Sequence, residues 1–167
     1  MVTTPLIQKA DRYFIGCCRT KLTKEYLPKI EDCLTNLSDD DIWWRAHETN
    51  NSIGNLMLHL AGNIRQWVYH HLGGKEYERT RDKEFSERMH IPKSELIAHL
   101  RSAMIDVDEV LKDFPVEKLL QQYTIQKYTV TGLEAILHIT EHFSYHTGQI
   151  IYITKLRTGK DLKFYNL

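Results

Sequence analysis

Apolar residues recur every three or four positions in four long stretches of the chain, a pattern typical of helices that bury one face. The first stretch covers residues 6–37, and Pro28 inside it predicts a kink or a break. The polar run that follows, residues 38–41, can cap a short turn. That turn would carry three apolar side chains, those of Ile42, Trp43 and Trp44.

The second helix is expected to begin at Asn51 or Ser52, both of which are good capping residues, and to end at Gly73 and Gly74. The third is expected to begin after Pro92, with Ser94 as its cap, and to end before the Phe-Pro pair at 114–115. Between them lies a polar connection, residues 75–92. Connections of this length are uncommon unless they are functional or packed as a lid, so this segment is a candidate for substrate selection.

The last third of the chain combines an extended piece with a helix. Residues 123–130 alternate with β-branched side chains, which favours a short extended segment. Thr131 and Glu134 have the spacing of a capping box, and the fourth helix should continue to about Arg157, with Gly159 as its stop. The sequence therefore predicts a mainly-α fold, an up-and-down four-helix bundle with a short extended insertion before the last helix.

The composition fits one domain spanning residues 1–167, with 42% hydrophobic residues and a mass of 19.7 kDa. Lys plus Arg and Asp plus Glu each total 22, and this zero net charge argues against nucleic-acid and anionic-membrane partners. The three cysteines include no CxxC pair, which favours a reducing compartment. With no secretory signal and no apolar run of membrane-spanning length, we expect a cytoplasmic protein.

Three of the nine histidines follow one another at one-turn intervals in the fourth helix. His142 and His146 fall inside its apolar stripe, whereas His138 lies on the flank. Two imidazoles at positions i and i+4 bring their ring nitrogens close enough to share one metal ion. The glutamate of a HExxH motif is absent, and Glu141 points about 100° away from His142. A nucleophile at this site would therefore be a water acidified by the metal.

A third ligand must come from another helix, and His59 in the second helix is the best candidate. It sits beside the apolar stripe, with the amides of Asn55 and Asn63 along the same edge, where they could orient a ligand. His71 also lies on the apolar side of this helix, so spacing alone leaves the choice open. A hydrogen-bonded histidine core without metal is a further alternative. We expect His47, His90 and His99 to be solvated or to lie in loops.

Two segments together carry a family resemblance: NSIGNLMLHLAGNIRQWV at residues 51–68 and EHFSYHTGQIIYI at residues 141–153. They closely resemble the DinB/YfiT-like superfamily, and within it a subgroup without an assigned biochemical function. DIWWR at residues 41–45, RDKEFSER at residues 81–88 and the stretch leading into the fourth helix extend the resemblance over nearly the whole chain.

The resemblance implies a four-helix bundle, often dimeric, that holds a divalent metal ion through three histidines. Carried over to this chain, these are His59, His142 and His146, with Gln149 as an amide that orients a ligand. Characterised relatives use the open metal position for thiol-dependent transfer or isomerisation with low-molecular-weight thiols such as bacillithiol or mycothiol. Others show only metal binding.

The expected function is therefore that of a divalent-metal-dependent enzyme, either a thiol-dependent S-transferase or a hydrolase, with zinc or nickel at an open three-histidine site. Its partner would be a small-molecule substrate, and the protein would form a homodimer. The alternative is a helical bundle that binds a metal or a small ligand without turning it over.

Overall fold

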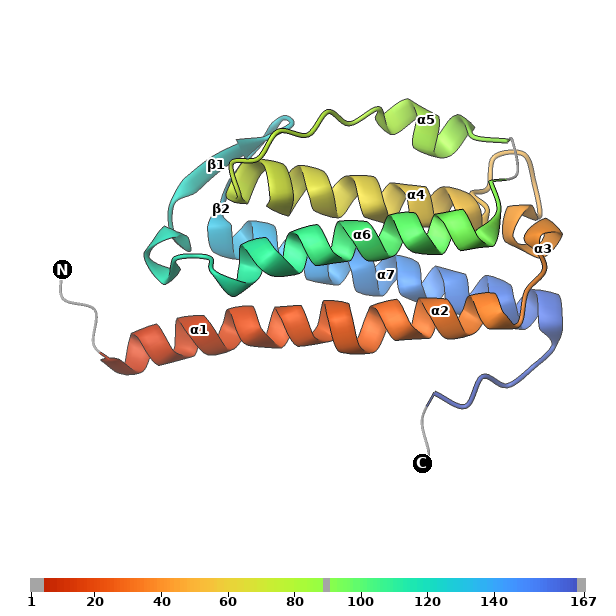
Figure 1. The fold of residues 1–167 in the computed structure, drawn as a ribbon, viewed down its shortest axis with the longest axis horizontal. Coiled ribbons are helices and arrows are strands. Elements are labelled where there is room, and N and C mark those ends of the chain that lie inside the picture. Colours follow the sequence, from red (N-terminus) through yellow and green to blue (C-terminus); the bar gives the residue numbers. More distant parts are fainter. Residues whose placement is uncertain (1–4, 89–90, 165–167) are drawn as a thin grey trace.

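The computed structural model describes residues 5–88 and 91–164, and over them the chain is mainly helical with one small antiparallel strand pair (Figure 1). This agrees with the mainly-α prediction. The long helical segments lie roughly side by side, and the strand pair and a short helix lie over one edge of them. Among the described residues, no helix is long and apolar enough to cross a membrane.

The first long segment is a single rod made of three parts: α1 (Pro5–Thr20), the π-helical η1 (Lys21–Tyr26) and α2 (Leu27–Thr35). The π turns immediately precede Pro28, where a kink or break was expected. Proline has no N–H to donate and its ring clashes with the carbonyl four residues earlier, which here belongs to Lys24 in η1. The helix accommodates the proline by widening locally rather than by ending.

The predicted short turn is helix α3 (Asp39–Trp43). Ser38 caps it: its Oγ accepts a hydrogen bond from the Asp41 N–H, and the Asp41 carboxylate accepts from the Ser38 backbone. Asp41 also pairs with Arg157 at the far end of the chain, at 2.7 Å. One carboxylate thus joins a helix cap to the last turn of the last helix.

Asp41→Asn is expected to destabilise the protein by about 1 kcal/mol near pH 7 because it weakens both contacts. The hydrogen bond from Ser38 and the neighbouring Arg157 lower the pKa of Asp41. This stabilisation is therefore present above the unfolded pKa of about 3.9 and is lost as pH falls through the folded pKa. Urea unfolding should show the difference between variant and wild type shrinking below about pH 4. Glu109→Gln, on an exposed site, is the control, and a difference independent of pH would contradict the prediction.

The second long segment consists of α4 (Ile53–Ile64) and the π-helical η2 (Arg65–Leu72). Ser52 caps it, as predicted, and it ends at Gly73. The third is α6 (Lys93–Lys112), which begins one residue after Pro92. Its cap position is Pro92 itself, whose carbonyl accepts from two N–H groups of the first turn, so Ser94 lies inside the helix and not at the cap.

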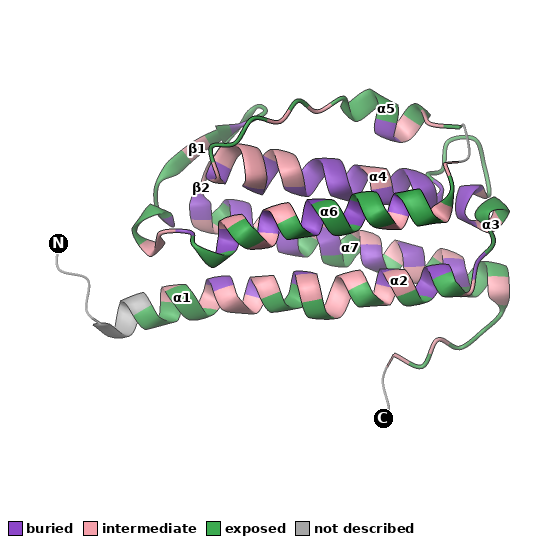
Figure 2. Cartoon of the chain, viewed as in Figure 1, coloured by how far each residue is buried: buried purple, intermediate pink, exposed green. Residues whose placement is uncertain are grey.

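The connection between them is not wholly irregular, because it contains α5 (Arg81–Ser86), a short helix that lies over α4. Figure 2 shows α5 mostly exposed, with a buried position on the side that faces α4. That position is Glu84, which is only 8% exposed. The charged composition of this segment gave no indication of a helix. Its inward residues are Glu84 and Phe85, and the ring centroid of Phe85 lies 4.7 Å from that of His59.

A single turn of 3-10 helix, η3 (Val116–Lys118), leads into the predicted extended region, which is a hairpin of β1 (Gln122–Ile125) and β2 (Tyr128–Thr131). Gln126 in its turn has a φ of 57°. Helix α7 (Gly132–Thr158) follows, and both of its predicted ends are confirmed: Thr131 and Glu134 form the capping box, and Gly159 adopts a φ of 65°.

The hydrophobic core lies between the long helices. Helix α4 packs against both α6 and α7, α2 packs against α7, and α1 packs against α6. Most buried positions in Figure 2 lie along the inward faces of α4, α6 and α7. Because α4 and α7 are direct neighbours, polar residues on their facing sides can meet inside the molecule.

Candidate metal centre

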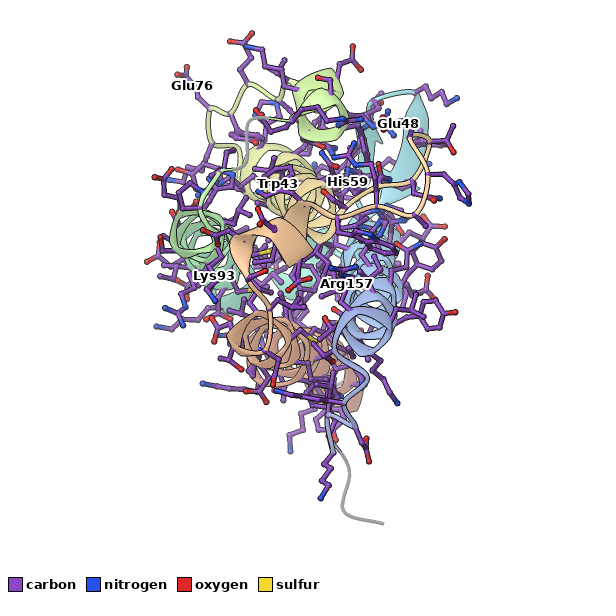
Figure 3. All side chains as sticks on the ribbon, turned by 90° about the vertical axis from the view of Figure 1, so that its right-hand side faces the viewer. Trp43, Glu48, His59, Glu76, Lys93 and Arg157 are labelled. Atoms are coloured by element: carbon purple, nitrogen blue, oxygen red, sulfur yellow. The ribbon has the colours of Figure 1, made fainter. Side chains whose placement is uncertain are left out.

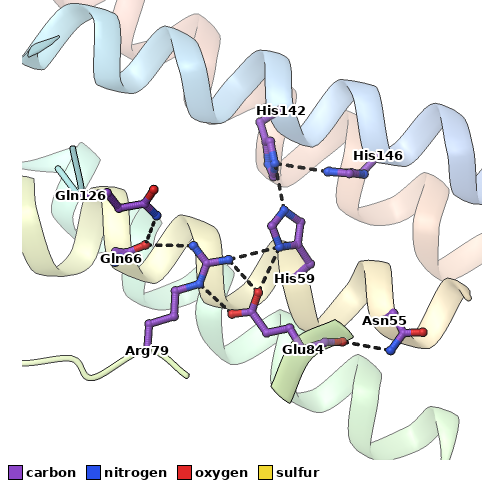
Figure 4. Close-up of polar contacts among 8 residues, drawn as sticks. All are labelled: Asn55, His59, Gln66, Arg79, Glu84, Gln126, His142 and His146. Atoms are coloured by element: carbon purple, nitrogen blue, oxygen red, sulfur yellow. Dashed lines mark hydrogen bonds and ion pairs between the residues drawn. The ribbon is translucent and has the colours of Figure 1, made fainter. Parts of the chain in front are cut away.

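Three histidines from α4 and α7 converge on one point (Figure 4). The Nε2 atom of His142 lies 3.1 Å from Nε2 of His59 and 3.2 Å from Nε2 of His146. Ligand atoms bound tetrahedrally at 2.0–2.1 Å from one zinc ion would be about 3.3 Å apart. The three side chains therefore have the spacing of a metal-ligand set, and they are the three that the family resemblance implied.

In two of these rings, the Nδ1 atom, which points away from the cluster, has a hydrogen-bond partner in another side chain. Nδ1 of His59 lies 3.0 Å from a carboxylate oxygen of Glu84, and Nδ1 of His146 lies 2.7 Å from Oε1 of Gln149. A carboxylate and an amide oxygen can only accept, so we assign the proton to Nδ1 in both rings. Nη2 of Arg79 also lies 3.1 Å from Nδ1 of His59, but this nitrogen donates to Glu84 at the shorter distance of 2.7 Å. The lone pair of each Nε2 then faces the other histidines, which is the tautomer a metal ligand needs.

The ring of His142 cannot provide hydrogen-bond donors to both of the Nε2 atoms that face it. Burial, followed by the charges of His146 and His59, lowers the pKa of His142 to about 3, so its ring is neutral and carries one N–H. A proton on Nε2 would be shared between two acceptors, whereas a proton on Nδ1 would leave three Nε2 lone pairs facing one another. The buried Nδ1 of His142 has no hydrogen-bond partner among the described residues in either case. A cation accepts all three lone pairs at once. The chemistry of the donor set thus fits a divalent ion better than a hydrogen-bonded core.

The histidines that were alternatives lie outside this cluster. His138 stacks on Trp67, with ring centroids 4.1 Å apart, and its ring centroid is 5.6 Å from that of His142. Nδ1 of His71 lies 2.7 Å from the carbonyl oxygen of Gln66, on η2. His47 and His99 are exposed, and His90 lies outside the described residues.

The three amides that were expected to orient ligands have different surroundings. Gln149 contacts His146 directly. Asn55 forms no hydrogen bond with any of the three histidines. Its amide nitrogen donates to the carbonyl of Glu84 at 2.9 Å and so connects α5 to the start of α4. Asn63 is buried beside the cluster, and its Oδ1 has no hydrogen-bond partner in the described part of the chain.

The sequence did not reveal the ion pair that supports His59. Both nitrogens on one edge of the Arg79 guanidinium donate to Glu84, at 2.6 and 2.7 Å, and the Arg79 side chain is only 3% exposed. Burial opposes ionisation of Glu84, but the hydrogen bonds from Arg79 and His59 outweigh it and lower the pKa of Glu84. Both residues belong to the connection expected to select substrate. The sequence showed that they are charged, but not that they pair with each other or contact His59.

This network continues to the hairpin. The other Arg79 nitrogen donates to Oε1 of Gln66 at 2.9 Å, and the same oxygen accepts from the amide of Gln126 at 2.7 Å (Figure 4). A chain of polar contacts thus runs from the hairpin turn through η2 to His59. These contacts hold the hairpin turn, η2 and the connection that carries Arg79 together around the histidine cluster.

A cavity of about 410 Å³ opens onto the cluster. His59 and His142 form part of its wall. The rest comes from the hairpin and from six other side chains, namely Asn63, Trp67, Arg79, Arg81, Glu134 and His138. In the view along the helices, His59 extends from α4 on the side away from α6 (Figure 3). The arrangement is a buried three-histidine cluster that a small molecule can approach from one side.

Comparison with known families matches residues 9–167 to the family described as "Protein of unknown function (DUF1572)". DinB/YfiT-like families are related to it. No curated protein matches the chain. Since the match covers nearly all of the sequence, including the three histidines and the Arg79–Glu84 pair, the chain belongs to the DUF1572 family.

Proposed function

We propose that this protein is a divalent-metal-dependent enzyme in which His59, His142 and His146 hold the ion. The observation that carries the proposal is the convergence of the three Nε2 atoms, with the protons of His59 and His146 drawn to the opposite side of their rings. Three protein ligands with a cavity beside them are the arrangement of catalytic zinc, whereas structural zinc has four protein ligands.

The chain's own residues orient the site and shield it from water. Glu84 holds the Nδ1 proton of His59, Arg79 keeps Glu84 ionised, and Trp67 and His138 form one wall of the cavity. A bound zinc or nickel ion would supply Lewis acidity that lowers the pKa of a thiol or water at the open position.

At this site we favour thiol transfer over hydrolysis. Glu84 is paired with Arg79, and the Glu134 carboxylate accepts two hydrogen bonds from Thr131 in the capping box of α7. Glu134 is thus the one carboxylate among the described residues that line the cavity, and one of its two oxygens is engaged by Thr131. A thiol has a free pKa of about 8.5 against about 15.7 for water, so a thiol at the open position ionises with less help than a water, and we propose an S-transferase first and a hydrolase second.

The remaining features are proposed together. We infer an up-and-down four-helix bundle of the DinB/YfiT-like type that forms one domain over residues 1–167 and acts on a small molecule, without nucleic-acid or membrane partners. The unpaired Cys17, Cys18 and Cys33 support a cytoplasmic location. A homodimer is supported by large apolar side chains exposed along α7, namely Leu137 and Tyr145.

Elemental analysis of untagged protein tests the metal site. We expect about one equivalent of zinc or nickel in the wild type and almost none in His59→Ala or His146→Ala. His99→Ala, which changes an exposed histidine, is the matched control and should keep its metal. A wild-type protein that contains no metal and takes up neither zinc nor nickel would overturn the proposal.

Catalysis is tested separately on the loaded protein. Transfer of a panel of low-molecular-weight thiols to an electrophilic acceptor should be accelerated by the wild type and by His99→Ala, but not by His146→Ala. A metal-loaded wild type that accelerates neither thiol transfer nor hydrolysis would favour the alternative, a bundle that binds a metal or ligand without turnover.

A further inference from the structure

A second cavity, of about 370 Å³, lies at the other end of the α4–α7 interface. It is formed by the loop before α4, residues 44–51, and by the last three turns of α7. Trp44, Tyr152 and Leu156 give it apolar walls, and Thr49 and Asn50 give it polar ones. It shares no lining residue with the cavity beside the histidines, so it is a separate site.

Arg45 is the one charged residue among the described residues that line this cavity. Its Nη1 atom is buried and has no hydrogen-bond partner, and the guanidinium forms no ion pair within the described part of the chain. Burial and the charge of Arg88 lower the pKa of Arg45, while the charge of Glu48 acts in the opposite direction. A partly desolvated guanidinium beside a cavity, without its own carboxylate, favours an anionic occupant.

The cavity is also linked to the histidine cluster. Leu56 lines the cavity and precedes His59 by one turn of α4, and Gln149 lines it and follows His146 by one turn of α7. Gln149 accepts the hydrogen bond from Nδ1 of His146. An occupant of the cavity would therefore lie against the amide that orients one of the three histidines.

We propose that this cavity binds the carboxylate group of a small molecule, held by Arg45 with the hydroxyl and amide groups of Thr49 and Asn50. The apolar walls accept a flat or aliphatic body next to the carboxylate. A carboxylate is matched by one guanidinium, which can bind both of its oxygens, whereas a doubly charged phosphate would call for more positive charge than this lining supplies. The carboxylate site does not depend on metal binding, and only its link to His146 rests on the proposed function.

Isothermal titration of metal-free protein with benzoate tests the site. Benzoate should bind the wild type, at least about tenfold more weakly to Arg45→Gln, and with intermediate affinity to Arg45→Lys. Arg101→Gln is the control: it removes the same charge from an exposed residue of α6 that neither lines the cavity nor acts on Arg45, and it should bind benzoate as the wild type does. The neutral benzamide should not bind measurably. Circular dichroism melting confirms that each variant is folded.

Three results would overturn the proposal: no binding of benzoate to the wild type, equal binding to Arg45→Gln, or tighter binding of phenyl phosphate than of benzoate. The same titration on His59→Ala separates this site from the metal centre, because benzoate affinity should be unchanged there even if the metal proposal fails. The link is read from the His146 ring nitrogens by NMR, whose signals should shift on benzoate addition in the wild type and not in Arg45→Gln. If these signals do not shift in a protein that binds benzoate, the cavity is not linked to His146.

Discussion

Glu84→Gln is expected to lower the free energy of unfolding of the metal-free protein by about 3–5 kcal/mol. The reason is Arg79, whose side chain is 3% exposed and whose guanidinium donates to both oxygens of Glu84. An amide offers one acceptor oxygen and no charge, so a buried cation would be left without compensation. Urea unfolding near neutral pH, with a chelator present, measures the loss.

The same substitution is expected to weaken metal binding by about 10 to 100-fold, because Nδ1 of His59 loses its carboxylate partner. Glu78→Gln, on an exposed position of the same connection, is the matched control and should leave stability and affinity unchanged. Adding Arg79→Met to Glu84→Gln removes the orphaned charge and should recover much of the stability but not the metal affinity. If Glu84→Gln were as stable as Glu78→Gln, the pair would not have the structural role assigned to it.

Gly62→Ala is the second large effect, although Gly62 touches no histidine ligand. A Cβ atom at this position of α4 would collide with Oε1 of Glu84 and lie 3.1 Å from Nε of Arg79. Because Glu84 is held by both Arg79 and His59, its carboxylate cannot turn aside without losing a contact. We expect a loss of about 1–3 kcal/mol in stability and weaker metal binding.

The control for this prediction is Gly16→Ala, since the space around a Cβ at Gly16 in α1 is open. That variant should gain about 0.5–1 kcal/mol because alanine favours helix over glycine. Equilibrium unfolding and a metal-competition titration on the two variants give the comparison. A Gly62→Ala protein that gains stability in the same way would show that the Glu84 carboxylate is not confined against α4.

Much of the architecture could be predicted because it depends on local signals. The apolar spacing located the long helices, and the Ser52 and Thr131 caps and Gly159 located their ends. These signals act between residues within one turn of each other, so the chain carries them whatever its tertiary structure is. The kink or break expected at Pro28 was predicted from a local signal too, and the chain accommodates the proline with a π-helical segment.

The pair His142 and His146 was apparent from the sequence by itself, because residues four apart on a helix share a face. Spacing alone did not show whether His59 or His71 joins this pair. The packing of α4 against α7 decides for His59, because it brings Nε2 of His59 to 3.1 Å from Nε2 of His142. The roles of Arg79 and Glu84 needed the tertiary structure entirely. A charged residue in a polar connection looks solvated in the sequence, and only the packing of α5 over α4 places Glu84 where its charge is buried, paired and directed at His59.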